Sequence, residues 1–196
     1  MDSFKGLIRR LITNLNASSL EYMFTGAIAA SFYGTPRTTM DVDIVINVSS
    51  GEASVLVHAL TEARVSPNDK KIKTALTSAD RIVTLRDTQT PYTVDLILAT
   101  EPLEKRAATI DGQPAYIQSP EALILAKLRM IKATPPPERA QKDRDDITAI
   151  LRNTPVDIDH IRRKAVKEGT LPTLEELLVQ ISYKKREGRP KTGRRP

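Results

Sequence analysis

The stretch TGAIAASFYGTPRTTMDVDIVINV, residues 25–48, decides how this chain folds. It begins with a glycine turn at Gly26 and continues through small and apolar residues that predict a short helix over 27–33. Residues 38–48 then alternate with a period of two and predict a strand. Asp41 and Asp43 lie inside that strand, although aspartate is depleted from strands. The two aspartates therefore need an explanation beyond local propensity, and function is the first candidate.

Side chains two residues apart on a strand point to the same face. Asp41 and Asp43 are therefore expected to project together, while Met40 and the alternate aliphatic residues after it face the core. Two neighbouring carboxylates repel each other unless a cation lies between them. Mg²⁺ suits such a pair, because it prefers carboxylate, water and phosphate oxygens. The alternative is that both acids lie on the solvated face of an edge strand, and the spacing alone does not decide between the two.

A third acid stands in the second of two strands predicted over 81–85 and 92–98, which the turn residues between them join as a hairpin. This residue, Asp95, would complete a carboxylate set able to hold two metal ions if it came beside Asp41 and Asp43. Such a carboxylate can also take the proton from an attacking hydroxyl. Asp95 could equally face solvent. Arg37, four residues before Asp41, carries a guanidinium that suits phosphate.

Lys127 lies in a helix that Ser119 and Pro120 begin, EALILAKLRMIKA over 121–133, which is apolar almost all round and should be buried. An ammonium on an apolar helix face must either extend to solvent or meet a buried anion. On the next predicted helix, 141–152, Asp143 and Asp146 border an apolar stripe. These two acids can pair with Lys127, with an arginine or with a ligand hydroxyl.

The remaining periodicity predicts mostly helices. The predicted segments are an amphipathic helix over 4–15, a strand over 20–25, a helix over 52–64 capped by Ser49 and Glu52, a polar stretch over 66–80, a short strand over 115–118 after a turn at Asp111 and Gly112, a helix over 156–168 ended by Gly169, and a last helix capped by Thr173 and Glu176. In the helix over 52–64 the predicted apolar face is Val55, Leu56, Ala59, Leu60 and Ala63, and His58 on its flank is expected at the surface or half-buried.

Composition limits the classes of function. The chain has 196 residues, enough for one core or for a catalytic core with a helical appendage, and one compact unit is expected. It has no cysteine and only two histidines, which excludes disulfides and thiolate chemistry and argues against zinc. No segment approaches the roughly 18 apolar residues of a membrane span. The expected compartment is the cytoplasm.

The net charge of +6 sits at the end of the chain. Residues 184–196, KKREGRPKTGRRP, hold seven Lys or Arg and one Glu, so the rest of the chain is neutral. Attraction to a polyanion must therefore come from this tail or from a local patch. Such a tail is most often a disordered, solvated end, and without aromatic residues it has no groups on which bases can stack.

With these residues in view, the chain resembles the nucleotidyltransferase-fold superfamily, and most closely the branch that contains AbiEii and MenT-type toxins. The family pattern is a glycine pair after a strand, a helix, a D-x-D on the next strand and a third acid on a later strand. Here Gly26-Ala27 precedes Asp41-Val42-Asp43, and Asp95 stands in YTVDLIL. The helical motifs are matched by EALILAKLRM and QKDRDDITAIL, so the resemblance covers roughly residues 20–152. Ala27 departs from the usual Gly or Ser.

The resemblance implies an α+β protein with the nucleotidyltransferase fold, in which helices flank a small mixed β-sheet and a helical bundle follows at the C-terminus. The implied division is a catalytic core over 1–118, a helical region over 119–183 that completes the site, and a basic, disordered tail over 184–196. It also implies the transfer of a nucleoside monophosphate from an NTP to a hydroxyl. The expected acceptor is RNA, notably a tRNA 3′ end, in the role of a toxin with a cognate antitoxin. The alternatives are transfer to a protein side chain and a non-catalytic protein that binds a nucleotide or a partner.

Carried over residue by residue, the resemblance makes Asp41, Asp43 and Asp95 the ligands of Mg²⁺, or of Mn²⁺, and the catalytic acids. Asp95 would also activate the acceptor. The nucleotide-binding residues would be Gly26, Ala27, Arg37, Lys127, Asp143 and Asp146, with Arg37 and Lys127 on the triphosphate. Backbone N–H groups at the start of the helix after Gly26 can bind an anion without the family's serine.

Overall fold

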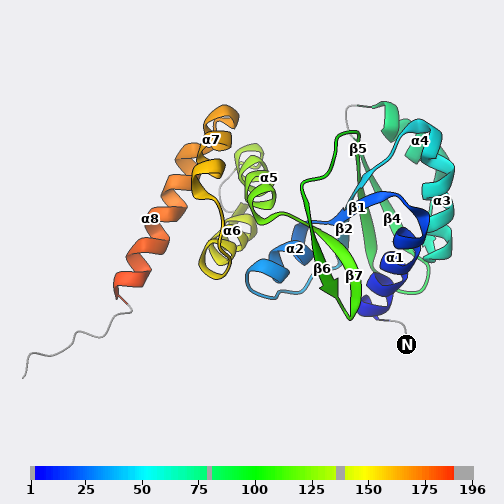
Figure 1. Cartoon of the computed structure of the whole chain (residues 1–196), viewed down its shortest axis with the longest axis horizontal. Helices are drawn as coiled ribbons and strands as arrows, with labels where there is room; N and C mark the ends of the chain where they lie inside the picture. Colours follow the sequence, from blue (N-terminus) through cyan, green and yellow to red (C-terminus); the bar gives the residue numbers. More distant parts are fainter. Residues whose placement is uncertain (1–2, 79–80, 136–139, 188–196) are drawn as a thin grey trace, which may run out of the picture. The chain divides into compact units, whose positions relative to one another are not determined.

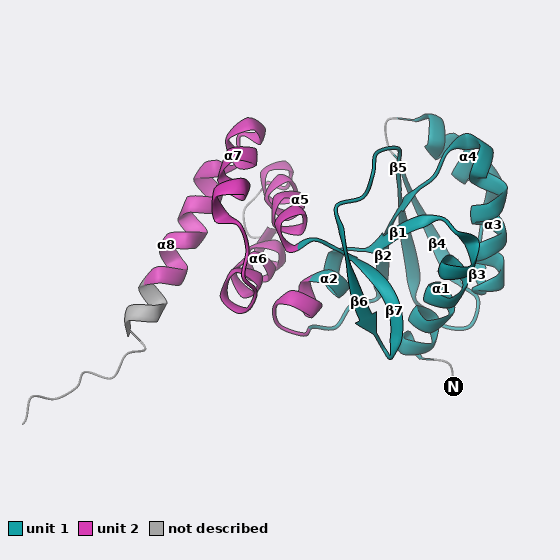
Figure 2. Ribbon diagram, viewed as in Figure 1, with its two compact units in different colours: residues 1–29, 37–119 teal, residues 30–36, 120–196 magenta. Residues whose placement is uncertain are grey.

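The computed structural model describes residues 3–78, 81–135 and 140–187. The chain divides into two compact units (Figure 2), unit 1 with residues 1–29 and 37–119, and unit 2 with residues 30–36 and 120–196. The expectation of one compact unit was therefore wrong. Its physical reason is that the helices after residue 119 bury their aliphatic side chains, among them Leu128, Ile147 and Leu174, against one another and so form a core of their own.

In the described part of unit 1, seven strands form one mixed sheet in the order β3-β4-β5-β2-β1-β7-β6. Strand β2 pairs antiparallel with β1 and parallel with β5, and β4 and β5 form the predicted hairpin. The strands are β1 Glu21–Phe24, β2 Asp41–Asn47, β3 Val65–Ser66, β4 Ile82–Asp87, β5 Thr93–Ala99, β6 Lys105–Ile110 and β7 Gln113–Gln118.

Helices α1 (Phe4–Ser18), α3 (Ala53–Glu62) and α4 (Asp69–Thr77) cover one face of this sheet (Figure 1). A short 3₁₀ turn, η1 (Ser50–Glu52), precedes α3. The helices bury Leu11, Leu60 and Ile72 against the strand residues that point toward them, such as Ile44 and Leu96. The opposite face of β2, β5 and β4 carries polar residues, and it is the face on which a site can form.

Unit 2 is helical. Helix α2 (Gly26–Tyr33) begins in unit 1 and ends in unit 2, where the Thr154 hydroxyl donates to the Tyr33 carbonyl at 2.7 Å. The other helices are α5 Pro120–Ala133, α6 Gln141–Asn153, α7 Ile158–Glu168 and α8 Leu171–Glu187. Gly169 ends α7 with a φ of 65°, as the sequence predicted. No helix in the described ranges is long and apolar enough to cross a membrane.

Several predicted boundaries were wrong. The strand predicted from residue 38 begins at Asp41, because its parallel partner begins at Thr93, opposite Asp41. Met40 is consequently 60% exposed instead of facing the core. Val55 of α3, which was predicted to lie on the apolar face, is 40% exposed because it lies at the border of the buried face of that helix. Helix α8 begins at Leu171, before the predicted cap at Thr173, because the Thr170 carbonyl already accepts from the Leu174 N–H.

Three elements were missed: strand β3, which has only two residues, helix α4 and strand β6. Helix α4 lies in the stretch that the sequence indicated only as polar; Asn68 caps it by accepting from the Lys71 N–H, and Ile72 is buried beneath it. Strand β6 is mostly exposed, so it lacks the apolar alternation that marks a half-buried strand. Helix α8 also takes in residues 184–187 of the predicted tail, and residues 188–196 lie outside the described part.

Other local predictions were confirmed. The Glu52 carboxylate accepts from the Ser49 N–H at 3.0 Å and from its hydroxyl at 2.6 Å, which forms the capping contact expected before α3. These two bonds lower the pKa of Glu52, the hydroxyl bond contributing most. His58 is exposed on α3, as expected of a surface histidine.

Candidate active site

The register of β2, β5 and β4 brings the three predicted acids to one face of the unit 1 sheet. Asp43 of β2 lies directly opposite Asp95 of β5, and Asp41 lies opposite Thr93. Opposed residues in a sheet point to the same face, and Asp41 follows the same period of two as Asp43. All three are half-buried. Val42, between the two aspartates of β2, and Ile44, after the second, are fully buried on the helix-covered side. We call this surface, defined by Asp41, Asp43 and Asp95, the acid face.

The turn from β1 into α2 is built against Asp43. The Thr25 N–H donates to the Asp43 carbonyl at 3.0 Å, and the Thr25 hydroxyl donates to Gln118 on β7. Gly26 follows with a φ of +55°, a conformation that residues with a side chain rarely adopt. A Cβ at Gly26 would lie 1.9 Å from Asp43 Oδ2. The glycine predicted from sequence is thus required both by its backbone angle and by the carboxylate beside it.

The carboxylates fit a hard cation by their chemistry. Asp95 Oδ1 is buried and has no hydrogen-bond partner among the described residues, which is costly for a carboxylate oxygen unless a ligand satisfies it. Asp41 accepts a short hydrogen bond from the Thr39 hydroxyl, two residues before it. As the side chains stand, no three His, Asp or Glu of the described ranges are arranged to hold a metal ion. Joint ligation by the acid face would therefore require a side chain such as Asp41 to turn.

Of two exposed arginines in unit 1, only Arg86 is placed on the acid face by the strand register. Arg37, predicted to bind phosphate, is exposed in the segment between α2 and β2. Arg86 was missed by the sequence interpretation. It is exposed on β4 opposite Thr93, which in turn lies opposite Asp41, so its side chain leaves the sheet on the acid face. The signal was the alternation of β4 itself, whose exposed positions are Ile82, Thr84 and Arg86.

Lys127, Asp143 and Asp146 form a separate cluster within unit 2. The Lys127 ammonium lies 2.8 Å from Asp143 Oδ1 and 2.8 Å from Asp146 Oδ2. Lys127 and Asp146 are each 6% exposed. Of the two alternatives left open by the sequence, the lysine therefore meets one buried and one half-buried carboxylate and does not extend to solvent. The two contacts hold the Lys127 ammonium in place. With two carboxylates on one ammonium, these three side chains carry a formal charge of −1.

The described residues thus hold the predicted site residues in two sets. Gly26, Asp41, Asp43 and Asp95 come together in unit 1, with Ala27 next in chain and buried. Lys127, Asp143 and Asp146 come together in unit 2. The chemical roles assigned to these residues stay predictions.

Comparisons with known proteins place the fold. No family model matches the sequence, and no curated protein matches it. Among solved structures, the solution structure of the antibiotic-resistance factor ANT(2'')-Ia matches with a TM-score of 0.61 at 14% identity, over 95% of this chain and 100% of that one. The crystal structure of ANT(2'')-Ia in complex with adenylyl-2''-tobramycin matches with a TM-score of 0.55 at 14% identity, over 92% of this chain and 98% of the other.

A third solved structure gives the same result. The crystal structure of an antigenic nucleotidyltransferase-like protein from Paracoccidioides brasiliensis matches with a TM-score of 0.57 at 16% identity, over 91% of this chain and 94% of that chain. These likenesses span nearly the whole length of each protein, and they agree with a mixed sheet flanked by helices. The expected α+β class is confirmed, and the chain has the nucleotidyltransferase fold.

Proposed function

We propose that this protein is a metal-dependent nucleotidyltransferase that moves a nucleoside monophosphate from an NTP to a hydroxyl of RNA, at a tRNA 3′ end. The observation that carries the proposal is the register of Asp43 against Asp95, with Asp41 on the same face. Three carboxylates on neighbouring strands repel one another, and that cost is tolerable where a cation and a polyphosphate bind. The buried Oδ1 of Asp95, which no described residue bonds, supports a ligand at this position.

Asp41, Asp43 and Asp95 would hold Mg²⁺ or Mn²⁺, which when bound neutralises charge on the phosphates. Asp95 accepts the proton of the acceptor hydroxyl. The hydroxyl oxygen then forms a bond to the α-phosphorus of the NTP as the bond from that phosphorus to the bridging oxygen breaks, and pyrophosphate leaves. Such a transfer asks mainly for positioning and for stabilisation of charge. The turn at Gly26 contributes by fixing Asp43 beside Asp95.

The nucleotide-binding part of the proposal concerns positive charge and backbone donors. Arg37 and Lys127 bind the triphosphate, and the first N–H groups of α2, around Gly26 and Ala27, offer donors to an anion. We add Arg86, which shares the acid face with Asp41, as a further phosphate ligand. Asp143 and Asp146 act on Lys127 by fixing its ammonium, with which they are in contact.

The toxin role, with a cognate antitoxin as partner, rests on the resemblance of the 25–48 stretch and of the two helical motifs. A second candidate acceptor is a small polyhydroxylated molecule. It is favoured by the match to ANT(2'')-Ia, whose structure contains adenylyl-2''-tobramycin and which the chain covers almost completely. Both candidates use the same attack of a hydroxyl on the α-phosphorus, so they differ only in the acceptor.

The test is incubation of the whole protein with each NTP labelled at its α-phosphate, with Mg²⁺ or Mn²⁺, and with total tRNA or tobramycin as the acceptor. The variants are Asp41→Asn, Asp43→Asn and Asp95→Asn, each of which keeps the side-chain shape and removes one charge. The matched control is Asp145→Asn on α6, an exposed carboxylate that accepts from Gln141 on its own helix and takes no part in the pairing of Lys127 with Asp143 and Asp146. Circular dichroism of every variant checks that the fold is retained.

The proposal expects label in tRNA, lost by at least about 100-fold in each of the three variants and retained in Asp145→Asn. Label in tobramycin with the same variant pattern replaces RNA by the second candidate. Label on the protein itself identifies a side chain as the acceptor. Absence of label under every NTP and both metals overturns the enzyme and leaves the non-catalytic binding protein.

A further inference from the structure

Strand β4 leaves part of its outer edge unpaired. In the β4–β5 hairpin, the Leu98 N–H donates to the Arg81 carbonyl at 2.8 Å and the Asp87 N–H donates to the Tyr92 carbonyl at 3.1 Å. Because paired groups alternate along an antiparallel strand, the N–H and C=O of Ile82 and Thr84 point away from β5. Strand β3 reaches only Arg86 and Asp87 before it ends at Ser66. Within the described residues, nothing pairs with Ile82 or Thr84 on that side.

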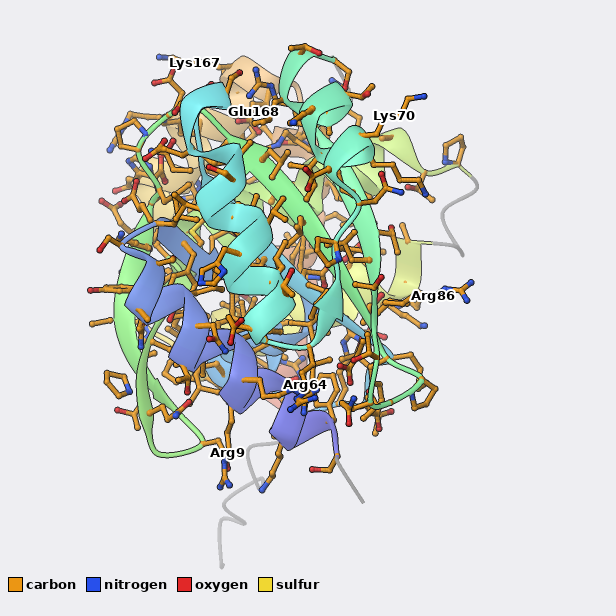
Figure 3. The ribbon with its side chains drawn as sticks, turned by 90° about the vertical axis from the view of Figure 1, so that its right-hand side faces the viewer. Arg9, Arg64, Lys70, Arg86, Lys167 and Glu168 are labelled. Atoms are coloured by element: carbon orange, nitrogen blue, oxygen red, sulfur yellow. The ribbon has the colours of Figure 1, made fainter. Side chains whose placement is uncertain are left out.

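A groove runs beside this free edge. It has a volume of about 480 Å³ and lies between β4 and helix α4. Ile82 and Thr84 line it from the strand, Lys70, Lys71 and Thr74 line it from the helix, and Ser78 lines it from the C-cap of that helix. Neither Lys70 nor Lys71 forms an ion pair with any described residue, whereas the nearby Lys73 pairs with Asp69. Figure 3 shows Lys70 on α4 and Arg86 on β4, both projecting outward on the β4 side of unit 1.

The two edges of the sheet are protected differently. Exposed edges invite pairing with another chain, and proteins usually place charged residues on them. The other edge strand, β6, carries Lys105 and Arg106. The free part of β4 carries no charge, and Ile82 is 61% exposed there. An uncharged strand edge with an exposed isoleucine, beside two lysines that form no ion pair within the described part of the chain, is the arrangement expected where another strand binds.

The chemistry of the edge selects the occupant. The outward groups of Ile82 and Thr84 are alternating donors and acceptors, which a polypeptide strand can match. RNA phosphates only accept hydrogen bonds, so they would leave the carbonyls unpaired. A second copy of this chain, paired edge to edge, would bring its own lysines against Lys70 and Lys71. An extended polypeptide with acidic side chains matches both the backbone groups and the charge.

We infer that the β4 edge is a docking site for an extended, acidic segment of a partner protein, which adds a strand beside β4 and places carboxylates on Lys70 and Lys71. The segment occupies the position beside β4 that β3 leaves after Ser66. Thr84 lies opposite Asp95, so the docked strand lies beside the acid face, separated from Asp95 by β4 alone. This site does not depend on the proposed transferase activity, because it concerns only a strand edge and a helix of unit 1.

The probe is a fluorescein-labelled peptide in which Glu alternates with Val, so that Glu residues face α4 and Val residues lie opposite Ile82 and Thr84. One control peptide replaces every Glu by Lys. A second control carries N-methyl groups on its Val residues, which blocks the backbone bonds and keeps the charges. Binding to the whole protein is measured by fluorescence anisotropy. We expect the acidic peptide to bind and both controls to bind at least about tenfold more weakly.

Amide hydrogen exchange followed by NMR distinguishes strand addition from loose electrostatic binding. In the free protein the amides of Ile82 and Thr84 should exchange fast, while those of Val83 and Leu85, which face β5, are protected. The acidic peptide should slow exchange at Ile82 and Thr84 by at least about tenfold, the size of one hydrogen bond at the upper end of its range. Unchanged exchange at these two amides in the presence of bound peptide overturns the inference.

Variants of the protein complete the test. Ile82→Pro removes one outward N–H at the first residue of the strand, where proline is tolerated, and Ile82→Val is its matched control. Lys70→Glu and Lys71→Glu reverse the charge of the groove, and Lys73→Glu reverses a charge that does not line it. Weaker binding in Ile82→Pro, Lys70→Glu and Lys71→Glu, with unchanged binding in Ile82→Val and Lys73→Glu, supports the site. Equal loss in test and control variants, tighter binding of the Lys peptide, absence of binding by the acidic peptide, or its displacement by an RNA oligonucleotide overturns it.

Discussion

Gly26 lies so close to Asp43 that a single methyl group on its Cα would fall 1.9 Å from the carboxylate oxygen Oδ2. The two residues come from different elements, the start of α2 and the middle of β2, and the Thr25 N–H joins the same pair of segments through the Asp43 carbonyl. The glycine therefore sets the position of a carboxylate that lies opposite Asp95. The β1–α2 turn is part of the acid face for this reason.

Gly26→Ala should destabilise the protein by the strain of its positive φ plus the collision with Asp43. The matched control is Gly112→Ala, where φ is +79° but no atom lies within 4 Å of the added Cβ, so only the strain of about 1–2 kcal/mol applies. Urea unfolding of both variants gives the difference. The double variant Gly26→Ala with Asp43→Ala should recover the part of the collision due to the carboxyl group, whereas the Cβ of residue 43, 2.9 Å from the added methyl group, remains. Equal losses for Gly26→Ala and Gly112→Ala would show that Asp43 moves aside at no cost.

The sequence predicted which acids share this face, but not the contacts that hold the predicted site residues in place. The period of two in 38–48 and the hairpin over 81–98 were enough to propose that Asp41, Asp43 and Asp95 share a face, because face and register follow from backbone geometry. The contact of Gly26 with Asp43 was not predictable, since it depends on how tightly the chain turns between β1 and α2. The pairing of Lys127 with both Asp143 and Asp146 was one of several open alternatives, because it depends on how α5 and α6 pack against each other.

The missed elements have a common cause. Helix α4 buries only Ile72, Ala75 and Leu76 among many polar residues, and strand β6 buries almost nothing. Periodicity detects burial, so an element that buries little gives a weak signal. Arg86 was missed with them, because its place opposite Thr93 depends on the exact pairing of the hairpin. The unpaired edge of β4 follows from the short length of β3, which no pattern in the sequence indicated.

Arg10 of α1 should be among the residues whose loss costs most stability in unit 1. Its guanidinium bonds Asp87 at 2.8 Å and donates to the Ala63 carbonyl at 3.0 Å, and the Asp87 side chain is fully buried. Arg10→Met leaves that carboxylate without its counter-charge, which costs about 3–5 kcal/mol. Urea unfolding followed by circular dichroism measures the loss.

Arg9→Met is the control for Arg10→Met, because it removes the neighbouring arginine. Arg9 pairs with Asp111 on the surface, and its side chain is 60% exposed. An exposed ion pair contributes at most about 1 kcal/mol. A loss in Arg10→Met no larger than that in Arg9→Met would contradict the importance of the buried Asp87 pair.

The buried Tyr22 predicts a loss of stability in alkali. Burial, and to a smaller extent the neighbouring Tyr116, raises the pKa of Tyr22 to about 12. Its hydroxyl donates to Asn16 Oδ1 at 2.9 Å. A pKa above the unfolded value of about 10 means that the stability contributed by the neutral phenol is complete below pH ~10 and is lost as the pH rises through about 12.

Tyr22→Phe removes this ionisation. The difference in unfolding free energy between the wild type and the variant should therefore shrink or change sign between pH 9 and 12, and the size of that change is set by the difference between the folded and unfolded pKa values. Thermal unfolding at a series of pH values measures it. The Tyr92→Phe variant serves as control, because Tyr92 packs on Phe4 and is not among the groups that raise the pKa of Tyr22. Parallel curves for the wild type and Tyr22→Phe over this range would contradict the raised pKa.

Lys127 allows structural support to be separated from nucleotide binding. Lys127→Met leaves Asp146, 6% exposed, and Asp143 without their shared cation, and should cost about 3–5 kcal/mol of stability. Adding Asp146→Leu removes the more buried of the two carboxylates that Lys127 contacts, so the double variant should regain most of that loss. Urea unfolding measures both variants.

The binding of a fluorescent NTP analogue to the same two variants then decides the role of Lys127. If its ammonium binds the triphosphate, affinity stays low in the double variant although stability returns, because Met cannot supply the charge. If Lys127 only compensates Asp143 and Asp146, affinity returns together with stability. Arg129→Met is the control: it removes an arginine on the same helix, 51% exposed and paired with Glu168, and should leave NTP affinity unchanged.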